Sequence, residues 1–101
     1  MLLLAAVLAL TAPQHPHVAR YAPHVVLAWQ HDGHGVTRFE IERSSAGGAF
    51  KRIGTTTHDA RSFYDPTSRP GVIYLYRIRA LGADAVSRWS DEILVKTKAI
   101  R

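Results

Sequence analysis

The stretch Tyr74-Leu75-Tyr76-Arg77-Ile78-Arg79-Ala80-Leu81 decides the fold, because its side chains alternate in character along its whole length. In an extended chain one face would carry Tyr74, Tyr76, Ile78 and Ala80, and the other would carry both arginines between two leucines. Just before this stretch, Arg69-Pro70-Gly71-Val72 has proline and glycine at the two central positions that a type II turn favours. The sequence therefore predicts a turn and then a long strand whose tyrosine-bearing face is buried.

Shorter stretches on both sides are also typical of strands bounded by turn residues. They comprise residues 18–21, 25–29, 38–43, 50–53, 62–64 and 92–97, and the loop at 44–49 has Gly47-Gly48 at its centre, as a hairpin loop requires. No ten-residue stretch after residue 13 keeps a helical period. Because a strand with one apolar face is not stable alone, the pattern predicts an all-β fold of seven strands in two antiparallel sheets packed face to face. The residues expected to hold this sandwich together are Trp29, Phe39, Ile41, Tyr74, Tyr76 and Ile78.

The composition is that of one packed domain. The chain has 101 residues, of which 47% are apolar and 21% charged, and this balance argues against disorder. It has no cysteine, which excludes a disulfide framework and a thiolate metal site. The net charge of +5 is spread from Arg20 to Arg101, with no basic run longer than Lys51-Arg52, so we expect no specific recognition of nucleic acid.

The first twelve residues differ from the rest. Residues 2–10 are all apolar, and Thr11 and Ala12 follow before Pro13, which is the order found in an export signal. No lysine or arginine precedes the run, and as a helix it would reach only ~15 Å, too little for a stable transmembrane span. The alternative is a linker or strand of a longer gene. We therefore expect a secreted or cell-surface protein, cleaved after Ala9 or Ala12, with a leader at 1–12, a Pro/His-rich linker at 13–17, a domain at 18–98 and a tail at 99–101.

Five landmarks in order resemble a fibronectin type III domain, over roughly residues 13 to 98. They are Leu27-Ala28-Trp29, Phe39-Glu40-Ile41-Glu42-Arg43-Ser44, Phe63-Tyr64-Asp65, the turn and strand from Pro70 to Ala80, and Ser87-Arg88-Trp89-Ser90. The resemblance implies an immunoglobulin-like sandwich in which Tyr74 is the tyrosine-corner residue, its hydroxyl bonded to backbone a few residues upstream. The leucine that usually precedes the Pro-Gly turn is Ser68 here, which predicts a less well-packed corner.

The resemblance also places charged and aromatic side chains. It makes the third and sixth strands neighbours, so that Glu40 and Glu42 lie across from Arg77 and Arg79 as structural ion pairs. Ser87-Arg88-Trp89-Ser90 is similar to half of the signature of cytokine receptor domains, which implies that Trp89 stacks on Arg77 or Arg79. The other half of that signature is absent, because Ala85-Val86 stands in its place.

Such domains mostly bind partners or hold other domains apart. The expected function is a non-catalytic extracytoplasmic module for protein binding, adhesion or spacing. The candidate binding surface comprises Trp89, Arg77, Arg79, Arg43, Lys51 and Arg52. Two alternatives stay open: a basic-surface binder of glycan or nucleic acid using Arg43, Lys51, Arg52 and Arg61, and an accessory fragment of a larger secreted carbohydrate-active enzyme.

Metal binding and catalysis receive little support from the sequence. His31, Asp32 and His34 form the weak metal candidate, and no third nitrogen ligand accompanies them, whereas zinc sites want three or four protein ligands. No Gly-x-Ser-x-Gly or His-Glu-x-x-His motif is present, and there is no cysteine nucleophile. We therefore expect neither a cofactor nor an enzyme.

Overall fold

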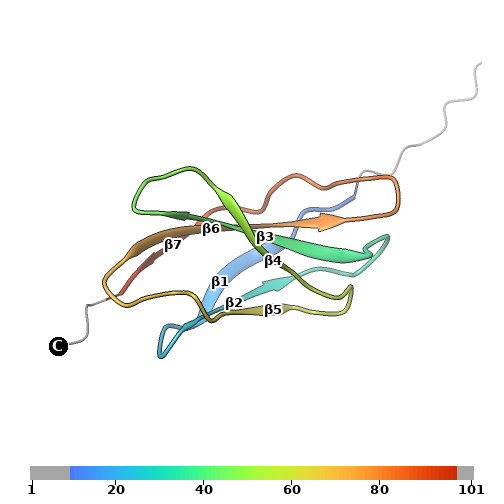
Figure 1. The fold of residues 1–101 in the computed structure, drawn as a ribbon. Coiled ribbons are helices and arrows are strands. Elements are labelled where there is room, and N and C mark those ends of the chain that lie inside the picture. Colours follow the sequence, from blue (N-terminus) through green and yellow to red (C-terminus); the bar gives the residue numbers. More distant parts are fainter. Residues whose placement is uncertain (1–9, 98–101) are drawn as a thin grey trace, which may run out of the picture.

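Seven strands form the structure, a computed structural model that describes residues 10–97 (Figure 1). They are β1 (Gln14–Arg20), β2 (Val25–Gln30), β3 (Arg38–Ser45), β4 (Lys51–Thr55), β5 (Ser62–Asp65), β6 (Ile73–Leu81) and β7 (Ile93–Lys96). Within this range there is no helix, and hence none that is long and apolar enough to cross a membrane. The predicted all-β class is confirmed.

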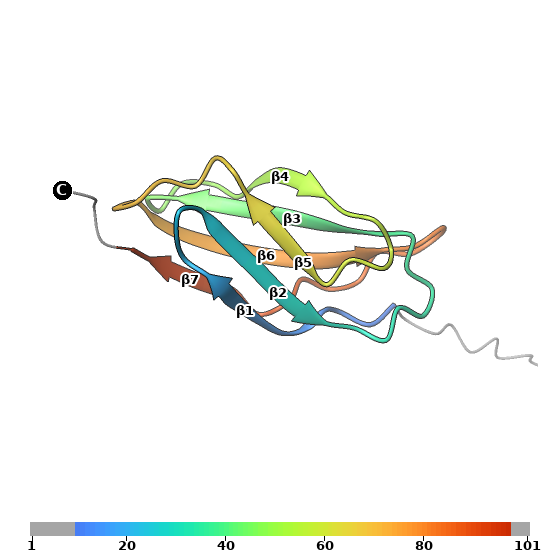
Figure 2. The ribbon, with the colours of Figure 1, turned by 90° about the horizontal axis from the view of Figure 1, so that it is seen from below.

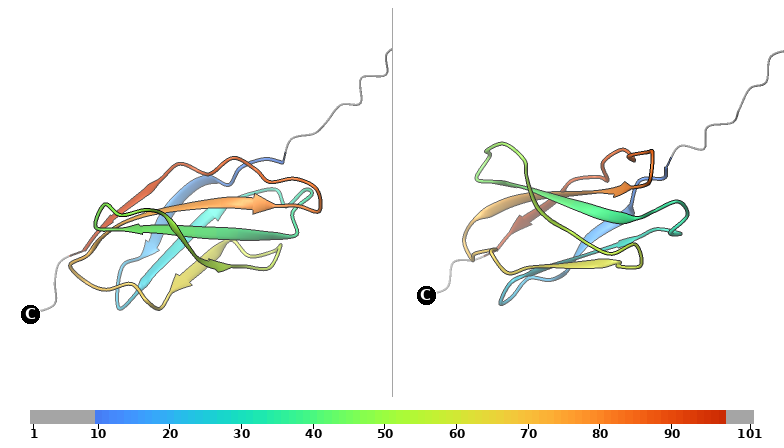
Figure 3. Two further views of the ribbon diagram at one scale, coloured as in Figure 1. Left: turned by 45° about the horizontal axis from the view of Figure 1, so that its top comes forward. Right: turned by 45° about the vertical axis from the view of Figure 1, so that its right-hand side comes forward.

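The strands lie in two antiparallel sheets, ordered β1-β2-β5 and β4-β3-β6-β7. Seen from below, β2 and β5 cross in front of β3 and β6 (Figure 2), and the two layers are separated in the right-hand view of Figure 3. The longest register joins β3 to β6, from Arg38 opposite Leu81 to Ser45 opposite Tyr74. The two strands with the clearest alternation thus form the centre of the larger sheet.

The core lies between the two sheets and contains every residue that the pattern placed there. Along β6 the buried positions alternate strictly with exposed or half-buried ones, as the period of two requires. The buried apolar residues are Val25, Leu27, Trp29, Phe39, Ile41, Tyr74, Tyr76, Ile78, Ala80, Ile93 and Val95. Each large side chain buried in this way stabilises the fold by about 1.5–3 kcal/mol.

The first strand differs from the prediction. It begins at Gln14 rather than at residue 18, so residues 14–17, expected as a linker, belong to the sheet. The prolines predicted that no strand would form here. However, β1 lies at the edge of its sheet, and the position without an N–H can face solvent there instead of a neighbouring strand. A register shift between Gln14 and His17, and a φ of 52° at His15, let the chain bulge around Pro16.

The corner before β6 is held by polar contacts. The Tyr74 hydroxyl accepts a hydrogen bond from the Arg69 backbone N–H at 2.9 Å, which is the expected tyrosine corner. The buried Ser68 hydroxyl accepts the Val25 N–H at 2.9 Å and donates to the Asp65 carbonyl at 2.9 Å. The serine thus replaces the packing of a leucine with two hydrogen bonds, which the prediction of a less well-packed corner did not include.

Replacing this serine tests its role. We expect Ser68→Ala to lower the free energy of unfolding by about 1–2 kcal/mol, because the buried Val25 N–H would lose its acceptor. Urea denaturation measures the loss. The exposed Ser62 on β5 supplies the control, since Ser62→Ala should leave the midpoint unchanged. Equal midpoints for the two variants would contradict the assignment.

Candidate functional site

The outer face of the larger sheet carries a stack of arginines and aromatic rings, which we call the arginine stack: Phe50, Arg77, Trp89 and Arg79. The Arg77 guanidinium carbon lies 4.1 Å from the centroid of Phe50 and 4.2 Å from that of Trp89. The Arg79 guanidinium carbon lies 4.3 Å from Trp89. Trp89 therefore contacts both arginines, as the resemblance implied, and Phe50 adds a ring that sequence reasoning missed.

Each arginine of the stack also holds a carboxylate. Arg77 donates to Glu42 from Nε at 2.9 Å, and Arg79 donates to Glu40 from Nε at 3.1 Å. The register sets both pairs, since Glu42 lies opposite Arg77 and Glu40 opposite Arg79. The expected cross-strand ion pairs are thus present, and they engage the charges that were candidates for binding a partner.

Two serines fix Trp89 over the sheet. The Ser87 hydroxyl accepts the Ala80 N–H at 2.8 Å, and the Ser90 hydroxyl accepts the Ile78 N–H at 3.0 Å. The backbone N–H groups of both serines donate to the carbonyls of the same two residues. This explains why serine occurs on both sides of the Arg88-Trp89 pair. The two serines form hydrogen bonds with the backbone groups of β6 at positions where β7 has not yet begun.

The contribution of the ring can be measured. We expect Trp89→Leu to lower the free energy of unfolding by about 1–2 kcal/mol, since two cation–π contacts of ~0.5–1 kcal/mol each are lost. Trp89→Phe keeps an aromatic face and should lose less. Chemical denaturation compares the two variants, and equal losses would show that the aromatic face makes no contribution.

Arg43, predicted as part of a binding surface, makes structural contacts within the domain. Its Nη1 donates to Asp65 Oδ2 at 2.8 Å and to the Thr67 hydroxyl at 2.8 Å, and its guanidinium lies 4.7 Å from the Tyr74 ring centroid. The buried Asp65 also accepts the Tyr76 hydroxyl at 2.6 Å. Sequence reasoning missed this group, because residues 22 and 11 positions from Asp65 meet there only through the fold.

The Asp65 carboxylate is kept ionised by its donors. Burial alone would raise its pKa, but hydrogen bonds from Tyr76, Thr67 and Arg43 outweigh burial, and the pKa lies below its usual value. The pKa of Tyr76 is raised by burial and by its bond to Asp65, so the hydroxyl remains a donor. The carboxylate of this buried ion pair is fully hydrogen-bonded and ionised, which is the state of a structural group, whereas the buried Arg43 Nε has no hydrogen-bond partner among residues 10–97.

Arg61, a candidate for binding polyanions, is likewise engaged. It donates to the backbone carbonyls of His31, His58 and Ala60 at 3.1, 3.0 and 2.7 Å, and its guanidinium lies 5.2 Å from the Phe39 ring centroid. These contacts tie the loop after β2 to the turn before β5. The positive charge of Arg61 is therefore engaged by contacts within the domain.

Lys51 and Arg52 differ from these arginines. Both are exposed on the edge strand β4, and among the described residues neither forms an ion pair. Two shallow hollows of about 360 and 310 Å³ meet at Arg52 and Ile53. The first also includes Lys51, and the second also includes Arg38. This basic edge is the most exposed part of the predicted surface.

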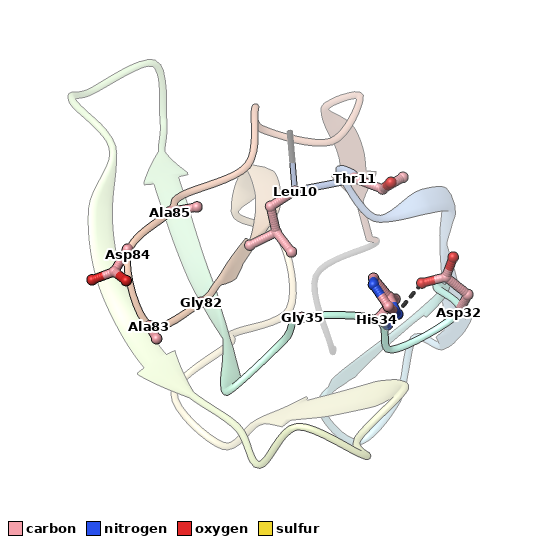
Figure 4. Close-up of a pocket in the computed structure, with 9 residues that line it drawn as sticks. All are labelled: Leu10, Thr11, Asp32, His34, Gly35, Gly82, Ala83, Asp84 and Ala85. Carbon is pink, nitrogen blue, oxygen red and sulfur yellow. Dashed lines mark hydrogen bonds between the residues drawn. The ribbon is translucent and has the colours of Figure 1, made fainter. Parts of the chain in front are cut away.

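The weak metal candidate is not assembled. The buried His31 ring donates from Nε2 to the Thr11 carbonyl at 2.7 Å, and its Nδ1 accepts the Gly33 N–H at 2.8 Å. Asp32 accepts the His34 backbone N–H at 2.8 Å beside a pocket of about 410 Å³ (Figure 4). Over residues 10–97, no three His, Cys, Asp or Glu side chains are placed to share a metal ion. His31 has no free nitrogen for a metal, because both are used within the loop.

Comparison with known proteins gives structural likeness only. No protein-family model matches the chain, and neither does any curated protein sequence. The twitchin kinase region from C. elegans is similar over 89% of this chain and 17% of its own length, with a TM-score of 0.77 and 23% identity. An Fn3-like protein from Clostridium thermocellum is similar over 92% of this chain and 98% of its own, with a TM-score of 0.71 and 19% identity.

A third similar structure is that of a glucanase. The β-1,2-glucanase from Parabacteroides distasonis is similar over 92% of this chain, with a TM-score of 0.78 and 19% identity. This chain spans only 13% of that structure and 17% of the twitchin structure. Sandwiches of this shape thus occur both within much longer chains and, in the Clostridium thermocellum protein, as nearly a whole chain.

Proposed function

We propose, from the premise that this chain has the fibronectin type III fold, that it is a non-catalytic module of an extracytoplasmic protein. The module spaces or presents the neighbouring parts of that protein, and it binds a protein partner. The similar structures support the modular part, since two of the three contain the sandwich within a much longer chain. The apolar run at residues 2–10 of the sequence supports the export part. Fold alone does not determine function, so the proposal depends on the positions of the two chain ends in this structure.

The observation that carries the proposal is where the chain enters and leaves the sandwich. Leu10 lines a pocket with Gly82, just past the end of β6, whereas the Thr97 hydroxyl accepts the Gly71 N–H just before β6 begins. The nine residues of β6 cover roughly 26 Å at ~3.3 Å per residue. Figure 1 has the blue start and the red end of the described chain at opposite ends of the sandwich. Domains joined at those ends would be held apart.

Fluorescence transfer between two dyes tests this geometry in solution. The chain has no cysteine, so Thr11→Cys with Lys96→Cys labels only the two ends. A second pair, Thr11→Cys with Val86→Cys, labels a single end, because Thr11 and Ala85 line one pocket. We expect clearly lower transfer for the first pair than for the second. Equal transfer would mean that the ends lie together, and the spacing function would be abandoned.

A second candidate function, binding of a polyanion such as a sulfated glycan, is favoured by the basic edge at Lys51 and Arg52. It predicts retention on heparin at low salt that weakens steeply as salt rises, because each phosphate or sulfate contact releases counterions. Lys51→Glu with Arg52→Glu should abolish retention, whereas Lys96→Glu with Arg69→Glu, the matched exposed pair, should reduce it only slightly. Equal losses of retention for the two double variants would show that heparin binding depends on net charge alone and not on the basic edge.

A further inference from the structure

Strand β4 has a free backbone edge. It is the last strand of the larger sheet and pairs only with β3, and among the described residues no hydrogen bond reaches the other side of its backbone. The edge strands β1 and β7, by contrast, contact each other. Figure 2 shows β4 at the border of its layer. A free edge carries N–H and C=O groups with which a further strand can pair, so β4 offers a place where an extended chain can be added.

The two hollows beside Arg52 and Ile53 follow this edge. The first also reaches Lys51, and the second also reaches Gly54. Ile53 packs against the core and is half-buried, so a ligand where the hollows meet would contact an apolar side chain. Phe63 of β5 fills the space beside Gly54, where a Cβ atom would lie 2.6 Å from the ring. The strand is thus packed firmly against the domain and hollowed along its free edge.

The lining of the hollows is basic. Arg38, Lys51 and Arg52 are exposed, and within residues 10–97 none of them forms an ion pair. Neither hollow includes an acidic side chain of the described chain. Arg43 lines the first hollow as well, and its buried Nε has no acceptor in the part of the chain that the structure describes. Carboxylates are the natural partners of these donors, so the edge suits an acidic ligand.

The charges also indicate which occupant fits the edge. Pairing β4 with β4 of a second copy would bring Lys51 and Arg52 of both chains together, and like charges on neighbouring strands are unfavourable. A sulfated glycan would meet the charges, but it lacks the regularly spaced N–H and C=O groups that pair with a strand. An extended polypeptide with acidic side chains provides both.

Resting on the proposed function, in which the module binds a protein partner, we infer that the partner adds an extended acidic segment to the free edge of β4. The segment would become the fifth strand of the four-stranded sheet. Its backbone would pair with β4, and its carboxylates would lie against Arg38, Lys51 and Arg52.

Titration of the full chain with a defined peptide tests strand addition. The probe is the capped peptide Glu-Val-Glu-Val-Glu-Val, and its control is the same peptide N-methylated at every residue, which keeps the charges but has no N–H donor. In NMR spectra the largest amide shifts should fall on β4. Hydrogen exchange of the β4 amides that do not pair with β3 should slow by about tenfold at saturation. The methylated peptide should bind about tenfold more weakly, because it cannot pair with a strand.

A matched pair of double variants tests the charges. Lys51→Glu with Arg52→Glu should weaken binding of the peptide by about tenfold or more, because attraction becomes repulsion along the edge. Lys96→Glu with Arg69→Glu makes the same change in net charge at exposed positions outside β4 and should weaken binding by about twofold at most. Equal weakening by the two variants would contradict the placement of the segment on β4.

The outcomes separate this inference from the proposed function. Equal binding of the two peptides, or protection of amides outside β4, overturns strand addition, and retention on heparin would then favour the polyanion candidate. If the peptide does not bind at all, the inference is overturned and partner binding through another surface stays the proposal. If the dye pairs give equal transfer while the peptide adds to β4, the spacing function fails and the inference stands.

Discussion

Asp65→Asn is expected to lower the free energy of unfolding by about 3 kcal/mol, the scale found when one partner of a buried ion pair is removed. The Asp65 carboxylate accepts four hydrogen bonds, two from Thr67 and one each from Arg43 and Tyr76. An asparagine has one carbonyl oxygen and one NH2 group. The NH2 group would therefore point at groups that themselves donate hydrogen bonds, and those bonds would be lost. Thermal denaturation should show a midpoint about 15 °C lower.

The same substitution predicts a pH dependence. The pKa of Asp65 in the folded protein lies below its unfolded value of about 3.9. The contribution of the ionised carboxylate to the free energy of unfolding is therefore complete above that pH, and it is lost as the pH falls through the folded pKa. The stability difference between the native protein and Asp65→Asn should therefore be constant from about pH 7 to pH 5 and shrink below about pH 4. Urea titrations at several pH values measure it.

A matched carboxylate serves as the control. Asp84 is exposed in the loop after β6, and Asp84→Asn should leave the melting temperature unchanged. If Asp65→Asn behaved like Asp84→Asn, or if its effect did not depend on pH, the ionised carboxylate would not hold this corner together.

Phe39→Ala is expected to destabilise the domain by about 4 kcal/mol, within the range for truncating a buried phenylalanine. Phe39 is completely buried, and its ring lies 5.3 Å from Trp29 and 5.4 Å from His31 between centroids. The Arg61 guanidinium covers it at 5.2 Å. Removing the ring would leave a cavity where β2, β3 and two loops meet. The melting temperature should fall by about 20 °C.

Phe50→Ala makes the same chemical change outside the core. Phe50 is half-buried just before β4 and contacts Arg77 on the outer face, so its loss should cost about 1 kcal/mol or less. Denaturation of both variants under one set of conditions makes the comparison. Similar losses for the two phenylalanines would contradict the placement of Phe39 at the centre of the core.

Local patterns were sufficient to predict the class of fold. The alternation in β6 and the Pro-Gly turn before it are local features, and a period of two can bury only one face of a strand. The ordered landmarks then gave the pairing of β3 with β6, from which the ion pairs of Arg77 and Arg79 followed. These predictions succeeded because each depends on spacing along a strand and on one neighbouring strand.

Which single charged residues the fold would engage could not be predicted in this way, because a side chain's partner is set by the fold. Arg43, Arg61 and Lys51 are all basic residues in or beside strands, and the sequence treats them alike. The structure turns Arg43 toward Asp65 and Arg61 toward three backbone carbonyls, and leaves Lys51 exposed. Their accessibility to a ligand therefore could not be assigned beforehand.

The sequence alone determined that this chain forms a sandwich of short strands, which faces of those strands are apolar, and that a turn at Pro70-Gly71 precedes the longest strand. Periodicity is a property of neighbouring residues, so no coordinates are needed to detect it. Only the tertiary structure decided that Asp65 joins Arg43 to Tyr76, that Ser68 replaces a leucine with hydrogen bonds, and that the Thr11 carbonyl accepts a hydrogen bond from the buried His31 ring. Those contacts join residues far apart in the sequence, and whether a polar group is satisfied depends on which distant donor or acceptor the fold brings to it.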